Sequence, residues 1–381
     1  MAQDTSQDSR SKERTAPDPE DPRKPDSPTE MSKPSWGYVA KRALSEFSKD
    51  DCTDLAASLT YFAVLSIFPA LLAIVSLLGV FGQGQATTQA ITGFLEGAAP
   101  PELVTLLEEP INNLTTGTGA GLALLTGIVG ALWTASGYTG AFGRAMNRIY
   151  EVEEGRPVWK LRPMNILVTL MLVLIVVLIM LMVLISGGIA QWVGDLVGLG
   201  TTAVTVWNIA KWPVVVILAV LLIAVLYYFT PNVQQPKFRW ISMGSIVALV
   251  VAAVAAAGFT WYVTNFASYN ATYGIIGSVI ILLLGLWIIN NVLLLGAEID
   301  AEVERGRQLQ GGIKAEESIQ LPPRDTRQVD KKEKKEEKLV DQGRKLRLEH
   351  EHLDYSSDDT GKNDTGKNNT GKNADKDSGR S

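Results

Sequence analysis

The sequence contains one cysteine, Cys52, and two histidines, His350 and His352. A single cysteine cannot form an intramolecular disulfide or a cysteine cluster for a metal ion. Both histidines lie in a strongly polar C-terminal stretch, so the rest of the chain has no imidazole for a Ser–His or Cys–His pair or for a zinc site. We therefore expect no hydrolase or nuclease chemistry, no metal and no cofactor.

Charge is also missing from long stretches of the chain, although charged residues make up 20 % of the whole. The stretch from Trp240 to Ala297 contains no Asp, Glu, Lys, Arg or His. A helix needs about 20 apolar residues to cross a bilayer, so this stretch is long enough for two crossings. The same rule predicts an all-α, polytopic membrane protein with six spans, at about 54–82, 118–142, 165–193, 206–230, 241–266 and 273–298.

Lysine and arginine are distributed unevenly between these spans. The loop after the second span contains five of them, whereas the loops after the first, third and fifth spans contain none. Lys211 is the one exception, and it lies at a helix end from which its long side chain can reach the interface. Cytoplasmic loops are enriched in Lys and Arg, so both termini are predicted to be cytoplasmic.

Polar segments flank the predicted membrane domain at 35–310. Residues 1–34 are rich in Pro, Asp, Ser and Lys, and we expect them to be disordered because they have little apolar surface to bury. Residues 311–381 form a charged tail with a low-complexity repeat at 359–373, and its removal is expected to leave the fold intact. The helical spacing of apolar residues at 36–47 fits either a helix in the membrane interface or a polar leader helix.

One set of candidate site residues follows the last two spans, and we group it as a substrate path. It comprises Asn265, Ser268, Tyr269, Asn270, Thr272 and Tyr273 in the turn between the spans, and Asn290, Asn291 and Glu298 along the last span. The turn residues fit either ordinary turn chemistry or an uncharged polar mouth for a solute or lipid head group. Polar groups at depth suggest function by default, with interhelical hydrogen bonding as the simpler alternative.

A second set lies at the cytoplasmic helix ends. It comprises Asp51, Asp54, Arg144, Asn147, Arg148 and Glu298. The simpler interpretation is a structural cluster in which Glu298 pairs with Arg144 or Arg148, and the functional one is a gate or a solute-binding site. Within the first span, Pro69 predicts a kink that neighbouring helices can tolerate.

Three stretches resemble a known family: DLAASLTYFAVLSIFPALLAIVSLLG, LWTASGYTGAFGRAMNRIYEVEEGRPVWKLRP and NFASYNATYGIIGSVIILLLGLWIINNVLLLGAEIDAE. Over about residues 36–310 the chain resembles the YihY/virulence factor BrkB family. The resemblance implies a six-helix protein of the bacterial cytoplasmic membrane, in a family that has been labelled both ribonuclease and serum-resistance factor. Its signature includes Pro69, Asn147, Arg148, Asn265, Tyr269, Asn270, Tyr273 and Glu298. The chain departs from the family pattern at Ala271, where Lys is common, and at Gly285, where a bulky aromatic is common.

Two functions are compatible with these features, and a third is disfavoured. A transporter or permease-like protein would move a small solute or lipid along kinked helices with polar groups at depth. A non-transporting membrane scaffold would instead act on envelope partners through its charged tails. A membrane nuclease is disfavoured by the missing histidines. We expect membrane lipids as partners and no nucleic acid, and the sequence leaves a homo-oligomer open.

Overall fold

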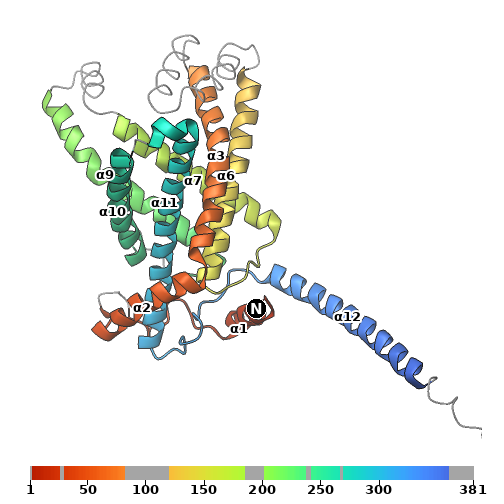
Figure 1. Cartoon of the computed structure of the whole chain (residues 1–381). Coiled ribbons are helices and arrows are strands. Elements are labelled where there is room, and N and C mark those ends of the chain that lie inside the picture. The colour runs from red at the N-terminus through yellow and green to blue at the C-terminus, as the bar shows by residue number, and fades with distance from the viewer. Residues whose placement is uncertain are drawn as a thin grey trace, which may run out of the picture. The chain divides into compact units, whose positions relative to one another are not determined.

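The computed structural model describes residues 2–25, 30–81, 120–184, 201–236, 242–266 and 269–359. Within these ranges the chain is helical, without a strand, which confirms the all-α prediction there. Figure 1 shows the helices α1 (Ala2–Thr15), α2 (Lys33–Lys49), α3 (Cys52–Phe81), α6 (Ala120–Ile149), α7 (Val158–Leu184), α9 (Thr201–Phe229), α10 (Met243–Phe266), α11 (Tyr269–Gln310) and α12 (Arg327–Asp359). The chain divides into two units, Met1–Val329 and Asp330–Ser381.

Four helices of the described residues are long and apolar enough to cross a membrane. They run over Val158–Val183, Thr202–Phe229, Met243–Asn265 and Val279–Gln310. Many of their apolar side chains are exposed, among them Leu174, Ile217 and Val254. Continuous exposed apolar surface of this kind marks a membrane or partner surface, and helices facing lipid require it. α3 and α6 coincide with the first and second predicted spans, and their crossing of the membrane stays a prediction.

The bundle is held together by close helix pairs. α3 packs along α6, and α11 packs against α10, α2 and α3. Phe142, Met146 and Leu294 are fully buried between these helices. At the crossing of α10 and α11, a Cβ atom on Gly244 would lie 2.0 Å from the carbonyl oxygen of Gly296, so this approach requires glycine. Small residues allow such contacts between helices in lipid.

The N-terminal segment differs from the predicted disorder of residues 1–34. Residues 2–15 form α1, and the Lys12 ammonium donates to the backbone carbonyl of Glu151 at 2.9 Å. The buried Lys24 ammonium donates to a carboxylate oxygen of Glu304, also at 2.9 Å. Composition predicted disorder because that argument counts apolar burial, whereas this segment is held by lysines matched to carboxylates of the body.

The C-terminal boundary also differs from the prediction at residue 311. Residues 313–326 lie on the body, where Ile319 and Leu321 are fully buried and Gln320 donates its backbone N–H to the Gln308 side chain at 2.9 Å. The first unit accordingly ends at Val329. α2 forms the helix expected at 36–47, and it packs on α11. Its contact with the membrane interface remains a prediction.

Candidate functional site

The polar residues of the first unit gather at one end of the bundle, here called the basal end. It consists of α2, the turn at residues 50–51, the loop 150–157 and the last turns of α11 (Figure 1). The backbone is left-handed at two acidic positions there, with φ of 51° at Asp51 and 54° at Glu151. Such conformations are uncommon for residues with a side chain, and they persist where surrounding contacts hold them.

One face of α11 contains a line of buried polar side chains leading to the basal end. Glu298 and Glu302 are four residues apart and share one face of the helix, and Asn290, about two turns earlier, is buried as well. Asn290 Oδ1 accepts from the Tyr138 hydroxyl at 2.8 Å, and its Nδ2 donates to Thr60 Oγ1 at 3.1 Å. This amide therefore connects α11 with α6 and α3 through interhelical hydrogen bonds.

Glu298 is the central group of this face. It is buried, and its Oε1 accepts from the Cys52 thiol at 3.4 Å. Further carboxyl groups surround it, those of Asp50, Glu302 and Glu46. An ionised carboxylate is costly to bury without a cationic partner. The pair of Cys52 and Glu298 is therefore an unusual arrangement for purely structural packing.

The structure differs from the predicted pairing of Glu298 with Arg144 or Arg148. Arg148 Nη2 instead pairs with Asp51 at 2.6 Å, and the Arg144 guanidinium lies over the Phe62 ring, 5.7 Å from its centre. The reason is the direction of the side chains: the exposed Arg148 meets the turn that precedes α3, whereas Glu298 faces the buried interior.

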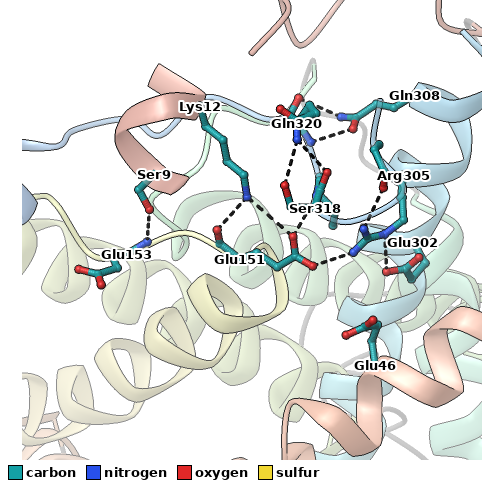
Figure 2. Close-up of polar contacts among 12 residues, drawn as sticks. Ser9, Lys12, Glu46, Glu151, Glu153, Glu302, Arg305, Gln308, Ser318 and Gln320 are labelled. Carbon is teal, nitrogen blue, oxygen red and sulfur yellow. Dashed lines mark hydrogen bonds and ion pairs between the residues drawn. The ribbon is translucent and has the colours of Figure 1, made fainter. Parts of the chain in front are cut away.

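A buried ionic network lies one turn of α11 beyond Glu298 (Figure 2). The Arg305 guanidinium donates to Glu302 Oε1 at 2.9 Å, to Glu151 Oε1 at 2.8 Å and to the Ala315 carbonyl at 3.0 Å. Arg305 and Glu302 are each only 1 % exposed. Within the described part of the chain, the second carboxylate oxygen of Glu302 is buried without a hydrogen-bond partner. The hydrogen bonds of this network therefore satisfy the Arg305 guanidinium more completely than the Glu302 carboxylate.

The turn before α3 contributes a titratable group outside the apolar helices. Burial raises the pKa of Asp50 to about 6, and the nearby charge of Arg148 opposes this shift. Asp54, also predicted for this cluster, is an exposed residue of the first turn of α3. Negative charge is favourable at a helix N-terminus, which accounts for Asp54 without a functional role.

Asn147 has a structural role in the described contacts. Its Nδ2 donates to Glu154 Oε2 at 3.0 Å, and its Oδ1 accepts from the backbone N–H of Asn232 at 2.6 Å. It thereby joins the end of α6 to the loop 150–157 and to the segment after α9. A buried amide that is hydrogen-bonded through both its oxygen and its nitrogen stabilises a unique loop geometry.

The structure describes the side chains of only part of the predicted substrate path, and the path stays a prediction. Asn265 is exposed and donates to the Trp261 carbonyl at 2.8 Å, and Asn291 donates to the Trp287 carbonyl at 2.8 Å, each along its own helix. Ser268 lies outside the described residues. The backbone of α11 is described at four further positions, but their side chains are not: Tyr269, Asn270, Thr272 and Tyr273. The same holds for Pro69 in α3, where the kink stays a prediction.

An all-helical chain with several helices suited to cross a bilayer, and polar groups buried between them, defines an integral membrane protein. Residues 43–319 match the model of the family described as virulence factor BrkB, and the chain belongs to this family. The resemblance found in the sequence is thereby confirmed.

Three relatives match this chain over 269 to 292 residues. It is 29 % identical over 269 residues to the ribonuclease-like protein YfkH of Bacillus subtilis (strain 168), covering 71 % of this chain and 96 % of that protein. It is 28 % identical over 272 residues to a UPF0761 membrane protein of Aeromonas salmonicida (strain A449), covering 70 % and 88 %. For the UPF0761 membrane protein RSc1559 of Ralstonia nicotianae (strain ATCC BAA-1114 / GMI1000), the values are 28 % over 292 residues, covering 72 % and 61 %. No solved structure matches this chain.

Proposed function

We propose that this protein is a permease-like transporter of a small solute or lipid in the bacterial cytoplasmic membrane. In this proposal α3, α6, α7, α9, α10 and α11 cross the membrane, and both termini are cytoplasmic. The basal end, with the basic residues that follow the second span, then faces the cytoplasm, as the distribution of Lys and Arg favours.

The observation that carries this proposal is the buried polar face of α11. Asn290 and Glu302 are 12 residues apart, about 18 Å along the helix, so polar groups extend from its middle to the basal end. Glu298 receives its hydrogen bond from a thiol rather than from a cation, and one oxygen of Glu302 has no partner among the described residues. Ionisable groups inside a membrane bundle mark substrate or ion pathways. We assign these two carboxyl groups to binding a cation, either the solute or a coupled ion.

The experiment uses Cys52, the single cysteine of the chain, as a reporter of water access beside Glu298. Inside-out and right-side-out vesicles are treated with a membrane-impermeant maleimide, and Cys52 labelling is compared with that of denatured protein. We expect slow labelling from the cytoplasmic side, because a transport cycle opens this buried position to water. Cys52→Ser is the control, and Asn291→Cys in that background tests a second depth. Complete protection of both positions from both sides would refute transport along this face.

The scaffold function has one observation in its favour. α12 is a strongly charged helix within a separate unit, and it exposes Leu339 and Leu346. Deleting residues 330–381 discriminates the two functions: a scaffold acting through this helix loses its cellular effect, and a transporter retains it. We propose no nuclease activity, since the only histidines, His350 and His352, lie in α12.

A further inference from the structure

Two arginines, Arg144 in α6 and Arg162 in α7, have no acidic partner in the part of the chain that the structure describes. Within the described residues, neither Arg144 nor Arg162 lies within ion-pair distance of a carboxylate, whereas Arg148, one turn from Arg144, is paired with Asp51. Each unpaired guanidinium lies over an aromatic ring instead. Arg162 is 5.3 Å from the centre of the Trp133 ring, and Arg144 stacks on Phe62. Cation–π contacts hold a guanidinium in place while its N–H groups stay available.

The two guanidinium groups are close enough to repel each other. Arg144 lies just beyond the span predicted at 118–142, and partial burial, followed by the charge of Arg162, lowers its pKa. Two like charges held together in a partly desolvated place destabilise the protein unless an anion is present. The arrangement therefore has the electrostatic character of an empty anion site.

A third donor points to the same place. Asn165 follows Arg162 by one turn of α7 and is 6 % exposed. A Cβ atom built on Gly140 would lie 3.0 Å from Asn165 Nδ2 and 3.8 Å from Arg144 Nη1. Gly140 thus allows the Asn165 amide to pack directly against α6, beside the Arg144 guanidinium.

We propose that Arg144, Arg162 and Asn165 bind the phosphate of an anionic membrane phospholipid. The site contains hydrogen-bond donors and two fixed positive charges, which is the chemistry that recognises phosphate oxygens. A lipid is favoured over a soluble anion because the site lies beside exposed apolar surface. Trp133 is 57 % exposed, and it shares one helical face of α6 with Gly140 and Arg144. Trp and Arg together are typical of the membrane interface. This inference rests on the proposed crossing of α6 and α7, and it does not depend on transport.

The test measures the melting temperature of the purified full-length protein in detergent during titration with lipid. We expect phosphatidylglycerol to stabilise the wild-type protein, and the concentration needed to rise at least tenfold in Arg144→Gln and in Arg162→Gln. Arg148→Gln is the matched control, since it removes the same charge one turn away and is expected to respond like the wild type. Phosphatidylcholine and inorganic phosphate are titrated in parallel.

Three results would overturn the proposal. Both site variants would respond to phosphatidylglycerol as the wild type does, phosphatidylcholine would stabilise equally well, or inorganic phosphate would do so at the same concentration. If the arginine variants do not fold, Gly140→Leu decides, because a side chain at this position displaces the Asn165 amide and the Arg144 guanidinium from each other and keeps both charges. Retention of the full lipid response in Gly140→Leu contradicts the site. Lipid titration and Cys52 labelling read different regions, so either proposal can fail alone.

Discussion

Replacing Arg305 by methionine tests whether the buried ionic network supports the fold. Methionine retains much of the aliphatic volume but removes three hydrogen bonds, to Glu302, Glu151 and the Ala315 carbonyl. Glu302 would then be buried with neither carboxylate oxygen paired by arginine. Removing one partner of a buried ion pair costs about 3–5 kcal/mol. The side chain of Glu151 is 20 % exposed and can recover some hydration, so we expect the lower end, about 3 kcal/mol.

The assay is thermal unfolding of the purified protein in a single detergent. For a body that spans Met1–Val329, about 3 kcal/mol corresponds to a fall in melting temperature of roughly 4–5 °C. Arg344→Met is the matched control, since Arg344 and Asp341 form an ion pair of the same three-residue spacing with side chains 62 % and 64 % exposed. Exposed pairs contribute about 0–1 kcal/mol.

A second variant separates loss of packing from loss of charge pairing. Adding Glu302→Gln to Arg305→Met removes the uncompensated carboxylate, so the double variant should melt above Arg305→Met alone. The reasoning is refuted if Arg305→Met lowers the melting temperature no more than Arg344→Met does. It is refuted equally if neutralising Glu302 gives no recovery.

Three further predictions concern stability. The raised pKa of Asp50, about 6 against an ordinary 3.8, means that the folded state favours its protonated form, so stability should fall as pH rises through about 4–6. Asp50→Asn should abolish roughly 1–3 kcal/mol of that fall in melts from pH 4 to 7, and an unchanged slope would contradict this. Truncation after residue 329 should leave the melting temperature unchanged, whereas truncation after residue 310 should lower it. Equal melting temperatures for the two truncated proteins would contradict a boundary at residue 329. Gly155→Ala places a Cβ atom 1.8 Å from the Asp325 carbonyl oxygen, so it should cost about 2 kcal/mol or more, and a neutral result would refute this contact.

Most helices could be predicted because the rule behind them is local. A run of about 20 uncharged apolar residues has few alternatives to a membrane helix, whatever lies elsewhere in the chain. The largest difference is at the end of the last predicted span, since α11 continues from residue 298 to Gln310. The charged side chains that ended the predicted span find buried partners there, so charge marks the end of the apolar run and not the end of the helix.

The site was less predictable because its contacts are remote in sequence. The burial of Asn290 and Glu298 follows from their position in an apolar run. Arg305 is 154 positions from Glu151, and Lys24 is 280 positions from Glu304. The one local signal was the spacing of Glu302 and Arg305 on a single helix. Pairing over such separations depends on the tertiary fold, and no pattern in a window of residues encodes it.

At the basal end, Glu298 lies inside the bundle without an ion pair among the described residues, whereas Arg144 and Arg162 lie at the outer surface, and this difference limits what each region can bind. Glu298 and Glu302 lie inside the bundle, whereas Arg144 and Arg162 are exposed at its outer surface. An anionic group moving along α11 would meet two carboxyl groups in a medium where like charges repel strongly. The proposed lipid phosphate is thus excluded from that face, and a transported species that passes Glu298 should be cationic or neutral. The outer arginines would then anchor lipid around the bundle, and the inner carboxyl groups would select the solute.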